Sequence, residues 1–449
     1  MSRRTVWGLG CLLAALAAGC DQVTPPADAS RPPPRDVAAD LPAPPAVTPA
    51  APDADDARFG VTARRWLMAG DALTPRDAFS VAVVAPAEVR LVDAWVDGAW
   101  AGPLARAADG TFRATLPLPA IGAHALLLSA DRGPTAFTAR PFHVSAALYA
   151  VVSVDWDSAD PPQANLTRMV QLRGAHPRLR YTQFVGPYVF TDPATSASRR
   201  QELVAWLRRQ RAAGDELGVH IHPRCTFVDT TGVTCRATPS YSYPEGDPTG
   251  YTVVLASYSA AEQATMLRAA AELMTRNGFE RPTSFRAGGW TTQLNTLEAC
   301  DEAGYLVESS AFPPETIQAS WGTRELGRWN LMNWTGITPT SQPYHPSRTR
   351  LIADEPPPTF RVLEVPDNGC LVDYMLGSSM IRVLRQNWPE DVALARSTVF
   401  QVGLHPESFD FNYYGRLDTA LREVDRHLHA DDAGPVVYAR LTELTPVWP

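Results

Sequence analysis

The sequence contains no lysine, so all 40 basic residues among its 449 are arginine. Arginine stays protonated in proteins and cannot act as an amine nucleophile. Every mechanism that needs a lysine nucleophile, or the lysine of a phosphate-binding loop, is therefore excluded. Schiff-base chemistry and P-loop chemistry are outside the repertoire of this chain.

The sequence also lacks clusters of positive charge. Its formal net charge is −8, and no basic block offsets this value. A nucleic-acid partner is not expected, because such proteins carry a basic patch that attracts phosphates. A composition of 45% hydrophobic and 20% charged residues is ordinary for a globular protein, and the length allows two folded domains.

The N-terminus resembles an export signal. Two arginines precede an apolar run over residues 6–18, which is too short for a convincing membrane span. The run ends in Leu16-Ala17-Ala18-Gly19-Cys20, which resembles the lipobox of bacterial lipoproteins. Ordinary cleavage after Gly19 is the alternative. We expect residues 1–19 to be a signal peptide, and Cys20 to carry a lipid anchor that holds the exported protein on a bacterial envelope membrane, periplasmic or at the outer surface.

Four cysteines follow Cys20 in the chain. In an oxidising compartment the short separation of Cys225 and Cys235 suits a local disulfide, and we expect that pair to be bridged. Cys300 lies on a predicted helix, and two alternatives remain for it: a buried free thiol, or a partner of Cys370.

Two segments precede the larger part of the chain. Residues 20–57 are dominated by Pro, Ala and Asp, which predicts a disordered tether. Residues 58–146 contain short alternating apolar runs separated by turn signals such as Asp109-Gly110. This pattern predicts a small all-β sandwich, and the stretch resembles the immunoglobulin-like modules often joined to bacterial secreted enzymes.

From residue 147 to 449 apolar strands alternate with helices. Such alternation implies parallel strands with helices packed outside, and a count of seven or eight favours a distorted (β/α) barrel over an open sheet. The fold class predicted for the whole chain is thus α/β, with a small β-sandwich before the barrel. The predicted strands include 148–154, 181–185, 217–222, 283–286 and 399–405, and the predicted helices include 198–211, 260–277 and 294–303.

Polar residues stand at the ends of four predicted strands, where the reactive residues of a β/α barrel gather. A two-histidine pattern taken alone is more simply explained by hydrogen-bonded side chains, but the convergence of carboxylates, histidines and an arginine at one mouth favours a metal site. The four stretches are Asp155-Trp156-Asp157, His220-Ile221-His222, Arg286-Ala287-Gly288-Gly289-Trp290 and His405-Pro406-Glu407.

In order and content these strand ends resemble the polysaccharide deacetylase superfamily, the NodB-homology carbohydrate esterases, over about residues 148–444. That family has an acidic pair, a two-histidine motif, an arginine motif and a late Leu-His in the same order. The spacings here resemble a divergent branch, because the aspartates are not adjacent and the histidines are two apart instead of four. Gly288-Gly289 also stands where the family usually has a proline and an aromatic residue.

The resemblance implies a divalent metal, zinc, as cofactor. Asp157, His220 and His222 would hold it, and two imidazoles with one carboxylate leave positions open for a water and a substrate oxygen.

The resemblance also assigns the remaining catalytic roles. Asp155 would be the base for the attacking water, kept ionised and aimed by Arg286. His405 would be the general acid that protonates the leaving amine, and a third metal ligand is the alternative role for it.

The sequence offers several candidates for substrate binding. The backbone N–H groups of Gly289 and Trp290 are candidates for stabilising the oxyanion, and the rings of Trp156, Trp290 and Trp321 are candidates for stacking on a sugar. Glu407, Asp367 and Glu364 are unranked candidates for shaping the pocket.

Together these features predict a hydrolase that removes N-acetyl groups from amino sugars of an envelope or extracellular polysaccharide. The alternative is a noncatalytic glycan-binding or scaffolding lipoprotein with a degenerate barrel. A glycosidase that uses Asp155 and Asp157 is disfavoured, because residues two apart on a strand face the same way.

Overall fold

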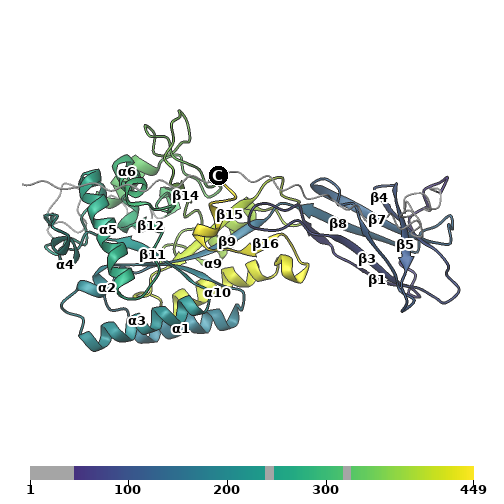
Figure 1. Cartoon of the computed structure of the whole chain (residues 1–449), viewed down its shortest axis with the longest axis horizontal. Coiled ribbons are helices and arrows are strands. Elements are labelled where there is room, and N and C mark those ends of the chain that lie inside the picture. The colour runs from purple at the N-terminus through teal and green to yellow at the C-terminus, as the bar shows by residue number, and fades with distance from the viewer. Residues whose placement is uncertain (1–44, 238–246, 317–324) are drawn as a thin grey trace, which may run out of the picture. The chain divides into compact units, whose positions relative to one another are not determined.

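The computed structural model describes residues 45–237, 247–316 and 325–449 (Figure 1). The predicted signal peptide, Cys20 with its predicted lipid anchor, the predicted tether up to residue 44, and Trp321 lie outside the described residues. Within the described ranges, no helix has both the length and the hydropathy of a membrane-spanning segment.

An all-β module forms the first part of the described chain. Its sheet runs in the order β1-β3-β6-β5-β4-β7-β8-β2, and β5 pairs with β6 and with β4 at different residues. Strand β3 buries Phe79, Val81 and Val83 and turns the residues between them outward, as one-sided burial requires. The strands are β1 (Gly60–Ala63), β2 (Trp66–Met68), β3 (Phe79–Val84), β4 (Val92–Val96), β5 (Ala99–Arg106), β6 (Phe112–Leu116), β7 (Gly122–Ala130) and β8 (Thr138–Ser145).

The chain joins this module before the predicted boundary at residue 58. Ala50 N donates to Pro134 O at 2.9 Å, and Asp56 N donates to Phe137 O at 2.9 Å. The last residues of the predicted tether therefore run along the module. Its immunoglobulin-like character stays a prediction.

A parallel sheet with helices outside forms the second part, which confirms the predicted α/β class. Its order is β14-β13-β12-β11-β10-β9-β15, and β16 also pairs with β9. The strands are β9 (Leu148–Asp155), β10 (Tyr181–Val185), β11 (Glu216–Ile221), β12 (Ser284–Ala287), β13 (Val307–Glu308), β14 (Leu363–Glu364), β15 (Thr398–Leu404) and β16 (Val436–Tyr438). The α-helices are α1 (Gln163–Ala175), α2 (Tyr188–Thr191), α3 (Ala197–Ala212), α4 (Cys225–Val228), α5 (Ala260–Arg276), α6 (Leu294–Ala303), α8 (Glu325–Trp334), α9 (Gly377–Asn387) and α10 (Phe411–Asp425).

The barrel is distorted in two places. Strands β16 and β10 share one side of β9: β16 pairs with the first residues of β9, and β10 pairs with the last residues of β9. Between β14 and β15 the described chain closes the sheet without a regular strand: Gly369 N donates to Gln401 O at 2.8 Å, and Val372 N donates to Gly403 O at 2.9 Å. These irregular contacts bring the segment after β14 to the barrel mouth.

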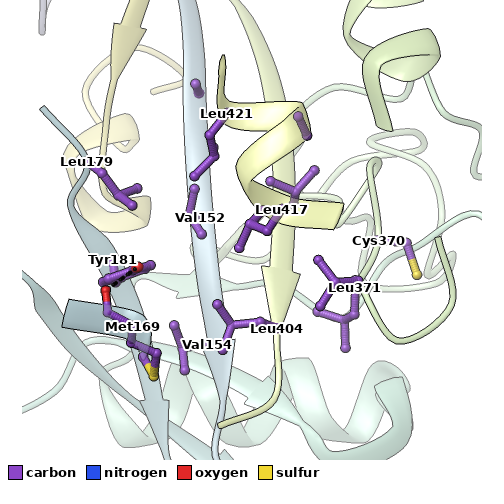
Figure 2. Packing of buried hydrophobic residues seen from close by; sticks show 14 of the residues in the cluster. Val152, Val154, Met169, Leu179, Tyr181, Cys370, Leu371, Leu404, Leu417 and Leu421 are labelled. Atoms are coloured by element: carbon purple, nitrogen blue, oxygen red, sulfur yellow. Dashed lines mark hydrogen bonds between the residues drawn. The ribbon is translucent and has the colours of Figure 1, made fainter. Parts of the chain in front are cut away.

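Strands β9 and β15 form the centre of the core because every one of their residues is buried. Burial along the whole length of a strand is typical of parallel strands covered on both faces. Figure 2 shows Val152 and Val154 of β9 between Leu417 of α10 on one side and Tyr181 of β10 on the other. This packing fixes the point at which the residues that follow β9 and β15 leave the sheet.

The disulfide predicted between Cys225 and Cys235 is confirmed, and it closes a loop directly after β11. Cys300 and Cys370 are both free and buried, so the alternative of a second bridge between them is not realised. Cys300 lies on α6, whose bounds match the predicted helix.

Candidate metal and catalytic site

The four polar stretches meet at one edge of the sheet, because the strands that carry them run parallel. They surround a cavity of about 100 Å³. Seven residues singled out from the sequence line the cavity: Asp155, Asp157, His220, His222, Gly289, Trp290 and His405. The remaining lining residues are Tyr251, Ala287, Leu326 and Tyr374.

Three of these side chains form the group of potential metal ligands found in the described residues. Ligand atoms of Asp157, His220 and His222 all lie within 4.8 Å of one another. Nε2 of His220 is 2.9 Å from Oδ1 of Asp157, and Nε2 of His222 is 3.2 Å from the same oxygen. They are the three residues predicted to hold the metal.

The outer hydrogen bonds of the two histidines fix their tautomers. Nδ1 of His220 is 2.9 Å from the carbonyl of Arg286, and Nδ1 of His222 is 2.9 Å from the carbonyl of Tyr251. A carbonyl can only accept, so Nδ1 carries the proton and the Nε2 lone pair of a neutral ring faces Asp157. Burial lowers the pKa of His222, against the opposing effect of Asp157, and so favours the neutral ring.

This donor set fits a divalent cation. Two nitrogen lone pairs and a carboxylate oxygen converge on one point, and no proton is left between them when the rings are neutral. Cations such as zinc take imidazole nitrogens and a carboxylate oxygen as ligands, and backbone carbonyls commonly orient the outer nitrogens. The residues present therefore suit the predicted cofactor, while the identity of the metal stays a prediction.

Hydrogen bonds fix the side chain and both backbone polar groups of Asp157, although this residue lies beyond the end of β9. Its Oδ2 accepts a 2.7 Å hydrogen bond from the hydroxyl of Tyr251. Its N–H donates to Oε1 of Glu407 at 2.9 Å, and its carbonyl accepts from Nη2 of Arg224 at 2.9 Å. Glu407, one of the unranked candidates, thus supports the backbone of Asp157.

Asp155 and Arg286 form a buried ion pair beside these ligands. Nη1 of Arg286 lies 3.1 Å from both carboxylate oxygens of Asp155. The arginine also donates to Ser153 Oγ at 2.9 Å, to Ser309 O at 2.6 Å and to Ser309 Oγ at 2.9 Å. With its nitrogens hydrogen-bonded, the fully buried guanidinium holds Asp155 in one orientation.

His405 approaches the same cavity from the end of β15. Its Nδ1 is 3.0 Å from Oδ2 of Asp373, and its Nε2 is 3.7 Å from Oδ2 of Asp157. Burial acts to lower the pKa of His405, but the charges of Asp373 and Asp157 together raise it well above its usual value. Sequence reasoning missed Asp373, which lies in the irregular segment after β14 and carries no motif.

The glycine-rich turn after β12 packs against His222. A Cβ at Gly288 would lie 2.5 Å from the imidazole of His222, so only glycine fits there. The next two residues, Gly289 and Trp290, have φ of 62° and 55°, which turns the chain sharply along the cavity. The oxyanion role of their N–H groups stays a prediction.

The tryptophans differ from what the sequence suggested. Trp156 is fully buried, donates from Nε1 to Gln183 Oε1 at 3.1 Å and packs against Trp206, so it does not line the cavity. The physical reason is strand alternation: Asp155 and Asp157 face the mouth, and the residue between them faces the helices outside. Trp290 lines the cavity but is 3% exposed, and its ring stacks on Phe312.

Two other pocket candidates lie behind the site. Asp367 is fully buried 3.4 Å from Nη1 of Arg286, and burial raises its pKa to about 6. Glu364 is fully buried on β14, where burial and then the charge of Glu308 raise its pKa. Neither residue lines the cavity.

No protein-family model and no curated protein matches the chain. Among solved structures it is similar to a putative polysaccharide deacetylase from Mycobacterium smegmatis, with TM-score 0.39 and 13% identity over 67% of this chain and 89% of the other. A family 4 carbohydrate esterase from Streptomyces lividans in complex with acetate gives TM-score 0.34 and 10% identity, covering 68% and 98%. A family 4 acetyl xylan esterase from Clostridium thermocellum with cobalt gives 0.32 and 14%, covering 66% and 89%.

Proposed function

We propose that this protein is a metal-dependent hydrolase that removes N-acetyl groups from amino sugars of an envelope or extracellular polysaccharide. One observation carries the proposal. A three-ligand group, a carboxylate paired with a buried arginine and a histidine paired with a second carboxylate all line a single cavity of about 100 Å³.

A divalent cation held by Asp157, His220 and His222 would polarise the acetamide carbonyl and lower the pKa of a bound water. Asp155 takes the proton of the attacking water, since Arg286 pairs with its carboxylate and orients it. The water oxygen then forms a bond to the carbonyl carbon.

His405, which lines the same cavity, completes the reaction. When the C–N bond breaks, its electron pair stays on nitrogen, and this amine needs a proton to leave. Asp373 orients the imidazole so that Nε2 faces the cavity and delivers that proton. The products are acetate and a free amino sugar.

The Cys225–Cys235 disulfide supports the further proposal that the protein is exported, because structural disulfides persist in oxidising compartments. We propose that Cys20 is the lipid attachment point. Metabolic labelling with a radioactive fatty acid tests this: incorporation should disappear in Cys20→Ser. Equal labelling of the variant would refute the anchor.

The activity is tested by incubating zinc-loaded protein with an N-acetylated glycan and measuring released acetate. Acetate release that His220→Ala abolishes supports the proposal. Glycan binding without acetate release, in protein with full metal occupancy, would instead support the noncatalytic alternative.

A further inference from the structure

The insert between β11 and α5 brings one tyrosine onto two of the three potential metal ligands. The hydroxyl of Tyr251 donates to Oδ2 of Asp157 at 2.7 Å. Its backbone carbonyl accepts from Nδ1 of His222 at 2.9 Å, and its ring stacks on the same imidazole with centroids 4.2 Å apart at 22°. Tyr251 therefore touches Asp157 and His222 through three different groups.

The Tyr251 ring also contacts a guanidinium. The guanidinium carbon of Arg224 lies 4.7 Å from the ring centroid, and the same guanidinium donates to the carbonyl of Asp157. A cation over an aromatic face stabilises both groups, particularly where water is excluded. The ring thus contacts both His222 and Arg224, and Arg224 in turn contacts the backbone of Asp157.

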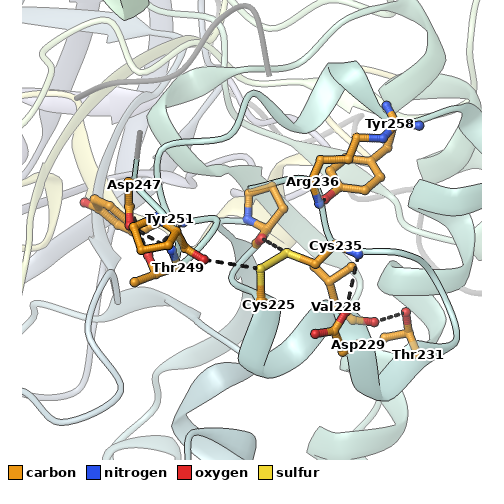
Figure 3. The surroundings of a disulfide bond; sticks show 12 residues. Cys225, Val228, Asp229, Thr231, Cys235, Arg236, Asp247, Thr249, Tyr251 and Tyr258 are labelled. Carbon is orange, nitrogen blue, oxygen red and sulfur yellow. Dashed lines mark hydrogen bonds between the residues drawn. A yellow bond between two sulfur atoms is a disulfide. The ribbon is translucent and has the colours of Figure 1, made fainter. Parts of the chain in front are cut away.

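The Cys225–Cys235 disulfide anchors the segment that carries this tyrosine. Figure 3 shows the disulfide beside Thr249 and Tyr251. Cys225 N donates to Thr249 O at 2.8 Å, and a Cβ at Gly250 would lie 2.4 Å from Pro223 O and 3.1 Å from Sγ of Cys235. The chain just before Tyr251 is packed directly against the disulfide and the end of β11.

We propose that Tyr251 is a positioning residue of the metal site. Its hydroxyl hydrogen-bonds Oδ2 of Asp157, so that Oδ1 is the oxygen that faces Nε2 of His220 and Nε2 of His222. Its backbone carbonyl fixes the tautomer of His222. Groups that orient metal ligands in this way typically contribute about 10- to 100-fold to metal affinity. The inference rests on the proposed function only in requiring that these three ligands bind a divalent metal.

The test uses Tyr251→Phe, which keeps the ring and the carbonyl and removes only the hydroxyl. Zinc affinity is measured on the full chain, without substrate, by competition with a chelating dye. We expect zinc to bind the variant about 10- to 100-fold more weakly than the wild type. The cobalt-loaded variant should also show an altered visible spectrum, because Oδ2 becomes free to approach the metal.

Tyr258→Phe is the matched control. Tyr258 belongs to the same insert and is buried, but its hydroxyl accepts from the backbone N of Arg236 at 2.8 Å. Removal of the Tyr258 hydroxyl should leave the zinc affinity within about twofold of the wild type. This change is well below the effect expected of a ligand-orienting group. An equal loss in both variants would assign Tyr251 a general packing role and overturn the inference.

The outcomes separate this inference from the proposed function. Wild-type affinity in Tyr251→Phe overturns the inference alone. A wild-type protein that binds zinc but releases no acetate overturns the proposed function alone. A wild-type protein that binds no divalent metal overturns both.

Discussion

Oδ2 of Asp373 lies 3.0 Å from Nδ1 of His405, so the second nitrogen of the imidazole is the one that faces the cavity. Asp373 comes from the irregular segment that closes the barrel between β14 and β15, and His405 follows β15 directly. The distortion of the barrel is therefore what brings the carboxylate to the histidine.

The role of this pair as an acid is tested by the leaving group. His405→Ala should lower kcat on an N-acetylated glycan by roughly 10²- to 10⁴-fold, the usual contribution of a positioned acid. The loss should be much smaller on an aryl acetate, whose leaving group departs without a proton. Steady-state kinetics on both substrates measure the difference, and Asp373→Asn should change them in the same direction. Equal losses on the two substrates would contradict the acid role.

The burial of Trp156 predicts an effect on stability and none on binding. Trp156→Phe leaves the buried amide oxygen of Gln183 without its donor, which typically costs about 1–3 kcal/mol. The free energy of unfolding should fall by that amount while KM for the glycan stays unchanged. Urea denaturation and steady-state kinetics check the two parts. A raised KM at unchanged stability would restore a stacking role for this tryptophan.

The sequence predicted best the elements that carry local signals. Helix α6, which a glycine follows, and strand β10, which is rich in aromatic and β-branched residues, have their predicted bounds. Strands β13 and β14 are only two residues long, and β16 pairs beside β10 on the edge of β9. The alternation of strands and helices predicted strands in these segments, but their short lengths and the place where β16 pairs depend on distant contacts that no local pattern encodes.

The same distinction holds for the site. Asp155, Asp157, His220, His222 and His405 were predicted because each ends a recognisable strand, and the structure brings them together. Alternation between the two aspartates should also have placed Trp156 away from the mouth. Asp373 and Tyr251, in contrast, lie on irregular segments, where no periodic signal marks the residues that fold back onto the site.

The buried carboxyl of Glu364 predicts a pH dependence of stability. Burial and then Glu308 raise its pKa well above 4.5 in the folded protein. A group with a raised folded pKa contributes stability that is fully present below the unfolded pKa and is lost as the pH rises through the folded pKa. In Glu364→Gln the amide cannot ionise. The free energy of unfolding of this variant should therefore fall less than that of the wild type between acidic and alkaline pH.

Urea denaturation midpoints of the two proteins across this pH range provide the measurement. Glu280→Gln is the control, because it removes a carboxylate that lies at the surface. Asp301→Asn would not serve, because the backbone N–H groups of Arg361 and Val362 donate to the Asp301 carboxylate. The control should follow the wild-type curve. Parallel curves for wild type and Glu364→Gln would show that this carboxyl does not titrate as inferred.

We propose that Asp157, His220 and His222 hold a metal on which glycan deacetylation depends. The decisive measurement is the acetate released from an N-acetylated glycan before chelation, after chelation and after zinc is restored. The metal content of each sample is determined in parallel. We expect about one zinc per chain in the active protein, loss of acetate release on chelation, recovery with zinc, and neither metal nor activity in His220→Ala. Acetate release by metal-free protein, or full activity in His220→Ala, would refute the role of the metal.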